Sequence, residues 1–334
     1  MLKNYFKTAF RNLTRNKMHS LLNIIGLSAG MAVTLLIGLW INDELSFDKY
    51  HHHYNRIAQV MQNQSLNGQV YTQPTIPMPL GSTLRTTYGR EFSKIVMSSN
   101  PGKHILASNN DHFIKTGNYM EANAPDLFSL KMLSGSGNGL KDPYSILLSQ
   151  SVATALFGKN NPVNKIIKFD DTASLLVTGV YEDLPVNTTL HNLEFIVPWA
   201  LQGKAIKNNI QNWGNNGWQI YVQLADHVAI NEASAKIRDA KYANAGIDNE
   251  QYKPVIFLHP MSKWHLYSEF KNGVNVGGRI QYLWLFGTIG LFVLLLACIN
   301  FMNLATAKSE KRAKEVGIRK AIGSQRKQLI FQFY

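Results

Sequence analysis

Two long runs of apolar residues dominate the hydropathy pattern of the chain. The first covers residues 21–41 and the second residues 282–305, and neither contains a charged side chain. A helix of 21 residues spans about 31 Å at 1.5 Å per residue, which matches the hydrocarbon core of a bilayer. The pattern predicts two transmembrane helices. Two buried helices of a soluble core are disfavoured, because a basic segment borders each run.

The region between the two runs predicts a mixed domain. Alternating polar and apolar positions indicate strands at 56–62, 69–75, 166–169, 175–180, 219–224 and 255–258. Helical spacing follows Pro79 and recurs at 149–157 and 229–240. The dipeptide Asn67-Gly68 between the first two strands predicts a hairpin turn. Because strands and helices do not alternate strictly, we expect an α+β domain.

The charge of the chain is concentrated at its two ends. The 334 residues carry a net charge of +13, yet residues 18–305 are almost neutral. Basic residues cluster instead in 1–17 and 306–334, which flank the apolar runs on the outside. The positive-inside rule therefore predicts that both ends face the cytoplasm and that the intervening domain lies outside. This distribution argues against a nucleic-acid-binding surface on the folded domain.

Five parts follow from this pattern. We expect an amphipathic basic helix at residues 1–17, which lies against the lipid on the inner face of the membrane. The first transmembrane helix follows at 18–42, and the external domain covers 43–278. The second transmembrane helix is expected at 279–305 and a cytoplasmic segment at 306–334. In the first transmembrane helix Gly26 and Gly30 are four residues apart. Small residues at this spacing allow another helix to approach closely, so we expect both glycines to pack against a helix.

The sequence contains few motifs that are typical of catalytic, cofactor-binding or metal-binding sites. The sequence contains no G-x-x-x-x-G-K-[ST] phosphate loop, so it gives no reason to expect ATP binding by this chain. The run His51-His52-His53 could suggest a metal, but adjacent side chains diverge, and we expect these histidines to be solvated near the membrane. The single cysteine, Cys298, lies in the second apolar run. We therefore expect no catalytic site, no cofactor and no metal, and a protein that is not an enzyme.

The segment after the second apolar run mixes basic and apolar residues. Gly317 and Gly323 interrupt its helical spacing, which predicts a short helix between two bends. Such a two-faced element just inside the membrane could dock on a cytoplasmic protein, or it could rest on anionic lipid. The residue pattern alone leaves both interpretations open.

Six segments of the sequence, taken in chain order, resemble one family. They are NLTRNK (12–17), LSQSVATALFG (148–158), LLVTGVYEDLPVNTTLH (175–191), WHLYS (264–268), CINFMNLATAKS (298–309) and EVGIRKAIG (315–323). These segments resemble ABC transporter permeases of the MacB/FtsX type, which have a MacB-like periplasmic core domain followed by the start of an FtsX-like permease domain. The resemblance covers essentially the whole chain, and its order fits the topology derived from charge.

The resemblance implies more than the spacing of residues does. It implies a bacterial inner-membrane protein whose periplasmic domain, 43–278, has a porter-like part built from its two sequence ends and an inserted second subdomain. It also implies a permease subunit that transmits force to that domain from a cytoplasmic ABC ATPase, a separate subunit that hydrolyses ATP. By resemblance, the residues that meet the ATPase are Glu315, Val316, Gly317, Ile318, Arg319, Lys320, Ala321, Ile322 and Gly323.

The same resemblance suggests further partners and several uses. A second permease copy or half, and a periplasmic adaptor or envelope partner, are expected, and the permease should continue beyond Tyr334 with further membrane helices. Efflux, lipoprotein handling and cell-envelope regulation all use this architecture. The alternative is a two-span membrane receptor with an extracytoplasmic sensor domain. A membrane-anchored periplasmic hydrolase is a weaker alternative, because no nucleophile or metal set is evident.

Overall fold

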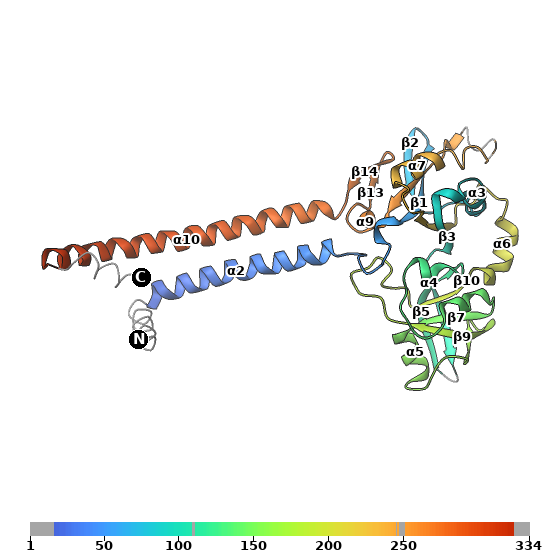
Figure 1. The fold of residues 1–334 in the computed structure, drawn as a ribbon, viewed down its shortest axis with the longest axis horizontal. Helices are drawn as coiled ribbons and strands as arrows, with labels where there is room; N and C mark the ends of the chain where they lie inside the picture. Colours follow the sequence, from blue (N-terminus) through green and yellow to red (C-terminus); the bar gives the residue numbers. More distant parts are fainter. Residues whose placement is uncertain (1–16, 109–110, 245, 247–250, 324–334) are drawn as a thin grey trace. The chain divides into compact units, whose positions relative to one another are not determined.

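The computed structural model describes residues 17–108, 111–244, 246 and 251–323. The chain divides into two compact units, each of which is described by itself. One unit, Met1–Asp43 with Gln281–Tyr334, contains the two long helices (Figure 1). The other unit, Glu44–Ile280, is a mixed domain of strands and helices, and we call it the core domain.

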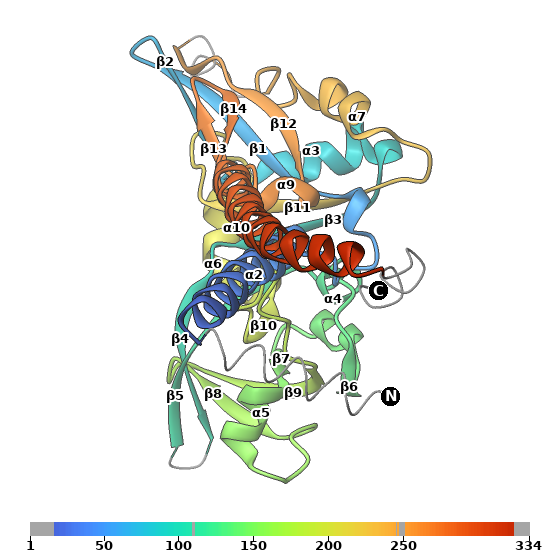
Figure 2. The same cartoon turned by 90° about the vertical axis from the view of Figure 1, so that its left-hand side faces the viewer.

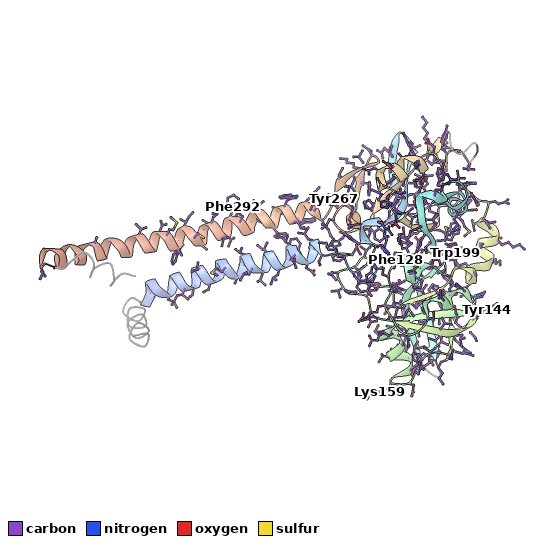
Figure 3. The ribbon with its side chains drawn as sticks, viewed as in Figure 1. Phe128, Tyr144, Lys159, Trp199, Tyr267 and Phe292 are labelled. Carbon is purple, nitrogen blue, oxygen red and sulfur yellow. The ribbon has the colours of Figure 1, made fainter. Side chains whose placement is uncertain are left out.

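Two long helices, α2 (Lys17–Leu45) and α10 (Ile280–Ala321), flank the core domain in sequence. Among the described residues, both contain a stretch long and apolar enough to cross a membrane, Ile24–Leu45 and Ile280–Asn303. Large apolar side chains such as Phe292, which is 60% exposed, lie on the outside of these helices (Figure 3). The predicted helix over residues 1–17 lies outside the described residues, apart from Lys17 at the start of α2.

The predicted bend at Gly317 is wrong. Helix α10 runs without interruption through Gly317 to Ala321, and only Gly323, at φ +100°, leaves the helical conformation. One glycine inside a helix costs about 1 kcal/mol relative to alanine. The surrounding Lys, Arg, Glu and Ala residues favour helix, so a single glycine is not sufficient to end it.

Within the described residues, twelve strands of the core domain form one sheet with the order β10-β7-β9-β8-β4-β5-β3-β11-β1-β12, to which β2 and β6 are attached. The strands from the two sequence ends of the domain are neighbours. They are β1 (Ile57–Leu66), β2 (Gln69–Gln73), β3 (Phe92–Ser99), β11 (Trp218–Leu224) and β12 (Val255–Pro260). They form what we call the terminal lobe.

The remaining strands come from one continuous insertion. They are β4 (Gly102–Ser108), β5 (Asp111–Met120), β6 (Met132–Gly135), β7 (Ser145–Ser149), β8 (Ile166–Phe169), β9 (Ala173–Tyr181) and β10 (Phe195–Pro198). We call this part the inserted lobe. A porter-like part built from both sequence ends, with an inserted second subdomain, was expected from the family resemblance, and the sheet order confirms it.

Short helices cover the sheet. They are α3 (Pro79–Thr87), α4 (Ala124–Leu127), α5 (Gln150–Phe157), α6 (Gly203–Asn209), α7 (Ile230–Ile237) and α9 (Met261–Trp264). Figure 2 shows α3 and α7 in the terminal lobe and α5 beside β9 in the inserted lobe. A separate hairpin, β13 (Glu269–Lys271) with β14 (Val274–Gly277), precedes α10.

Three hydrophobic clusters hold the core domain together. The first packs Val60, Ile220 and Leu258 of the terminal sheet against α3 and α7. The second fills the inserted lobe between its sheet and α5. The third combines residues of both lobes, among them Tyr221 and Phe128. Figure 3 places Phe128 near the middle of the core domain. This shared cluster makes the two lobes one compact unit.

Candidate functional site

The last turn of α2 is tied to the end of the core domain by a buried carboxylate. Glu44 is 7% exposed, and its Oε2 accepts a hydrogen bond from His265 Nε2 at 2.6 Å. The guanidinium of Arg279, the residue before α10, lies 3.7 Å from Glu44 Oε1. The ring of His265 also stacks on Phe47, with centroids 3.4 Å apart. We call Glu44, His265 and Arg279 the junction triad, because it joins the two places where the chain enters and leaves the core domain.

A second carboxylate holds the segment after α2 against the inserted lobe. Asp48 is 1% exposed, and its Oδ1 accepts hydrogen bonds from Thr188 Oγ1 and from the Thr189 backbone N–H. Its Oδ2 accepts a third from Thr189 Oγ1 at 2.7 Å. The backbone N–H of Asp48 donates to the Asn187 carbonyl, and the Asn187 side chain donates to Ser46 Oγ. We call this set the Asp48 clamp. A carboxylate that accepts three hydrogen bonds is well compensated for its burial.

The prediction that the three adjacent histidines are solvated is wrong for His51. This side chain is 1% exposed, with Nδ1 donating to the Phe128 carbonyl at 2.6 Å and Nε2 lying 3.0 Å from Thr188 Oγ1. Burial lowers the pKa of His51, although the hydrogen bond with Phe128 and the charge of Asp48 act in the opposite direction. His52 is exposed, because neighbouring side chains diverge, and so only one member of the run enters the core.

The three histidines do not form a metal site. No group of three His, Cys, Asp or Glu side chains in the described part of the chain is placed to hold a metal ion. His51 instead extends the Asp48 clamp, since Thr188 Oγ1 lies between His51 Nε2 and Asp48 Oδ1. This network connects the segment after α2 to α4 and to the loop after β9.

The two glycines expected to pack against a helix lie beside α10. A Cβ atom added at Gly30 would come within 2.8 Å of Ala297 Cβ, and one added at Gly26 within 3.3 Å of the Asn300 amide. In the same unit Thr34 Oγ1 lies 3.4 Å from the Gly290 carbonyl. Glycine at position 30 therefore permits an approach between α2 and α10 that a larger side chain would prevent.

The segment expected to meet an ATPase lies at the end of α10. Residues 315–321 are helical, and Ile318 and Ile322 are 60% and 79% exposed. These two apolar side chains are four positions apart, a spacing that places them on one face of a helix. The side chains of Glu315, Val316, Arg319 and Lys320 lie outside the described part of the structure. The role of this segment stays a prediction.

The junction triad and the Asp48 clamp were not predicted as sites from the sequence. Their members are far apart in the chain: Glu44 and His265 are separated by 221 positions, and Asp48 and Thr188 by 140. The sequence contained only an indirect indication of these residues. Thr188 and His265 lie in two of the segments that resemble the family, 175–191 and 264–268.

Comparison with known proteins assigns most of the chain. The family model described as "MacB-like periplasmic core domain" matches residues 20–240, and the model described as "FtsX-like permease C-terminal" matches residues 287–334. The chain is 28% identical over 220 residues to the "Macrolide export ATP-binding/permease protein MacB" of Haemophilus ducreyi. This match covers 62% of the chain and only 28% of the length of that relative.

Solved structures show similar folds at low sequence identity. A crystal structure of a domain of a permease protein from Porphyromonas gingivalis matches with a TM-score of 0.54 and 17% identity, over 63% of this chain and 91% of that one. The periplasmic region of MacB from Actinobacillus actinomycetemcomitans matches with a TM-score of 0.45 and 17% identity, with the same shares covered. The first of these shows a common fold for the core domain.

Proposed function

The chain belongs to the MacB/FtsX family of ABC transporter permeases, and we propose that it transmits force from a cytoplasmic ATPase to its periplasmic core domain. It is a membrane protein with a periplasmic domain between two spans. Its family membership favours a permease over the two-span receptor that the sequence left as the alternative. We place it in the bacterial inner membrane, with both ends of the described chain in the cytoplasm.

In this proposal the chain is a non-catalytic subunit. Its 334 residues contain no phosphate loop, whereas the Haemophilus relative is named an ATP-binding and permease protein. We propose that a separate ABC ATPase subunit binds and hydrolyses the ATP that drives this chain. We further propose a second permease copy or half as a partner, and a periplasmic adaptor or other envelope protein as the recipient of the motion.

The observation that supports force transmission is the junction triad. Glu44 lies in the last turn of α2, and Arg279 immediately precedes α10. Because one carboxylate holds both His265 and Arg279, the two ends of the core domain cannot separate without breaking these contacts. A hydrogen bond to a charged group contributes about 1.5–3 kcal/mol. Movement of a helix end is then passed to the folded domain instead of being lost in a loose linker.

The cargo is a separate question from the mechanism. Macrolide export belongs to the name of the Haemophilus relative, and that name concerns a protein of which this chain spans 28%. Efflux, lipoprotein handling and cell-envelope regulation each require the same transmitted motion. The proposal for this chain therefore concerns the mechanical step that the three uses share.

The test uses the full-length permease with its ATPase in proteoliposomes. A fluorophore on Lys159→Cys, in the exposed end of the inserted lobe (Figure 3), reports movement of the core domain when ATP is added. The native Cys298 is first replaced by alanine. We expect Glu44→Gln to reduce the ATP-dependent signal at least by half while the ATPase continues to turn over, because the weakened junction allows the helix ends to move alone.

The matched control is Glu269→Gln. Glu269 is an exposed carboxylate on β13, close in sequence to His265. Its substitution should leave the ATP-dependent fluorescence signal unchanged. A full ATP-dependent signal in Glu44→Gln would show that the junction triad does not transmit the motion.

A further inference from the structure

The hydrogen bonds of the buried His51 determine where its protons lie. Its Nδ1 is 2.6 Å from the Phe128 carbonyl oxygen, and its Nε2 is 3.0 Å from Thr188 Oγ1. A carbonyl oxygen only accepts hydrogen bonds, so Nδ1 carries a proton. Whether Nε2 carries a second proton depends on the direction in which the Thr188 hydroxyl donates.

The Thr188 hydroxyl has one proton and two neighbours that can accept it. Besides His51 Nε2, its oxygen lies 2.8 Å from Asp48 Oδ1. Asp48 also accepts hydrogen bonds from the backbone N–H and the hydroxyl of Thr189. Three donors favour the ionised carboxylate, so the Thr188 proton points to Asp48 and its oxygen presents a lone pair to His51. The contact at Nε2 is then a hydrogen bond only if Nε2 is protonated, which makes the ring an imidazolium cation.

A neutral His51 ring would leave one contact of this network without a proton. If the Thr188 proton turned to Nε2, the Thr188 oxygen and Asp48 Oδ1 would be two acceptors 2.8 Å apart. The carboxylate would also lose its counter-charge, because in the described part of the chain Asp48 has no Lys or Arg partner. A buried charge without compensation is costly. A proton on Nε2 removes both problems.

The remaining titratable side chains around His51 do not replace Asp48 in this role. They are His52, Tyr50 and Tyr54 on its own segment, Asp126 of α4, and His191 in the loop after β9. Asp126 is engaged by Lys94 Nζ at 2.9 Å, and His191 Nδ1 lies 2.9 Å from the Thr188 carbonyl oxygen. Phenol rings are uncharged at neutral pH. Asp48 is therefore the carboxylate that acts on His51.

Burial opposes a charge on His51, and the two effects have to be weighed. Burial is the largest cause acting on the pKa of His51 and lowers it, and the neighbouring His52 adds to this lowering. The hydrogen bond with Phe128 and the charge of Asp48 raise the pKa. We give the hydrogen bonds more weight than burial, because a neutral His51 would leave the charge of Asp48 buried and would remove its counter-charge.

We propose that His51 and Asp48 form an ion pair bridged by the Thr188 hydroxyl, and that the segment after α2 is held less firmly to the inserted lobe when His51 loses a proton. The bridge joins the turn after α2, the end of α4 and the loop after β9. Without the Nε2 proton, Thr188 donates to His51, and Asp48 keeps only the two donors of Thr189. This inference concerns the fold and is independent of the force-transmitting role.

The sign of the pH dependence distinguishes the ion pair from a neutral histidine. A bridged imidazolium contributes stability below about pH 6.5, the pKa of histidine in an unfolded chain, and loses it as pH rises through the higher pKa of the folded state. A histidine that burial keeps neutral does the opposite, because stability is lost as pH falls below about 6.5. The stability difference between the native chain and Thr188→Val, measured by urea unfolding, should therefore shrink as pH rises.

Nitrogen-15 NMR of the full chain in lipid nanodiscs tests the protonation directly. Tyr50-His51 is the only Tyr-His dipeptide in the sequence. Carbonyl-labelled tyrosine combined with carbon- and nitrogen-labelled histidine therefore identifies the His51 signals without any substitution. We expect both ring nitrogens of His51 to carry a proton at neutral pH. A spectrum with one protonated and one unprotonated ring nitrogen would overturn the proposal.

Substitutions at position 188 isolate the bridge. Thr188→Val has nearly the same shape but no hydroxyl, so His51 should be neutral in this variant at neutral pH. Thr188→Ser keeps a hydroxyl and should retain the doubly protonated ring. The matched control is His52→Gln, which changes the exposed neighbour and should leave the His51 signals unchanged. A doubly protonated ring in a folded Thr188→Val chain would show that the hydroxyl is not the bridge.

Hydrogen exchange measures how firmly the segment is attached. After correction for intrinsic rates, the backbone amides of residues 187–190 should lose about tenfold in protection between neutral pH and about pH 9, because Asp48 loses one donor. The amides of β11 serve as the internal standard. In Thr188→Val the protection of 187–190 should be low at both pH values. Equal protection at both pH values in the native chain would overturn the proposed pH dependence.

Discussion

At the scale of single residues, two aspartates with similar backbones behave differently. Asp48 and Asp171 both have left-handed backbones, with φ of 62° and 54°. Asp48 is buried and accepts three hydrogen bonds, whereas the side chain of Asp171 is exposed. Asparagine tolerates the left-handed region as well as aspartate does. The pair therefore separates the effect of the hydrogen bonds from that of the backbone.

We predict that Asp48→Asn destabilises the core domain by about 2–4 kcal/mol, because the amide nitrogen faces a donor and leaves Thr188 or Thr189 without its acceptor. Asp171→Asn should change stability by less than about 0.5 kcal/mol. Urea unfolding of the full chain, followed by tryptophan fluorescence, measures both variants. Equal stabilities would mean that the clamp contributes little to the fold.

At the scale of elements, local signals predicted the structure well. Asn67 and Gly68 adopt φ of 51° and 78°, the left-handed pair that a two-residue hairpin turn requires, and they join β1 to β2 as the dipeptide indicated. The helix that begins at Pro79 and the one that ends before Gly158 were predicted from similar local residues. The sequence signal in these cases depends on neighbours within a few positions.

Elements that depend on distant partners were not predicted. Strand β10 (Phe195–Pro198) is buried along its whole length and pairs with both β5 and β7, so it shows no alternation of polar and apolar positions. His51 could not be assigned to the interior, because its partners Phe128 and Thr188 are 77 and 137 positions away. The junction triad was not predicted for the same reason. These features depend on contacts between residues far apart in the chain. The periodicity of polar and apolar positions does not indicate such contacts.

The end of α10 gives an element-scale test of the proposed contact with an ATPase. We predict that Arg319→Glu and Ile318→Ser each reduce the amount of ATPase that co-purifies with the full-length permease. Both variants should also reduce the stimulation of ATP hydrolysis by the permease. Reversing one charge at a protein interface costs a few kcal/mol, and Ile318 is an exposed apolar side chain on the same segment.

If the segment instead attaches to anionic lipid, we expect different effects of these two substitutions. Lipid attraction contributes about 1 kcal/mol for each basic residue and depends little on Ile318. The matched control is Lys311→Glu, a charge reversal in the same basic stretch but outside 315–323. If Lys311→Glu and Arg319→Glu have equal effects while Ile318→Ser has none, the segment contacts lipid and not the ATPase.

At the scale of the whole molecule, the fold explains how one domain can be driven from two helices. The terminal lobe is assembled from both sequence ends, so its first strand β1 pairs with its last strand β12, and Glu44 at the end of α2 meets His265 in the junction triad. The inserted lobe shares a hydrophobic cluster with it, which includes Tyr221 and Phe128. A displacement delivered at the junction triad would therefore move both lobes together.

This reasoning requires the ends of the chain to be on the opposite side of the membrane from the core domain, which cysteine labelling can test. Two positions suit a membrane-impermeant maleimide in a Cys298→Ala background. Asn215 is exposed in the core domain, and Ile322 is 79% exposed after α10. Ser98, although it lies in the same domain, is fully buried and would not react on either side.

We predict that Asn215→Cys is labelled in intact spheroplasts and that Ile322→Cys is labelled only after the membrane is permeabilised. The physical reason is the basic excess in 1–17 and 306–334, which retains both segments on the cytoplasmic side. The Cys298→Ala chain without a new cysteine provides the background. Labelling of Ile322→Cys in intact spheroplasts would place the proposed ATPase-docking segment on the same side as the core domain and would contradict the force-transmitting role.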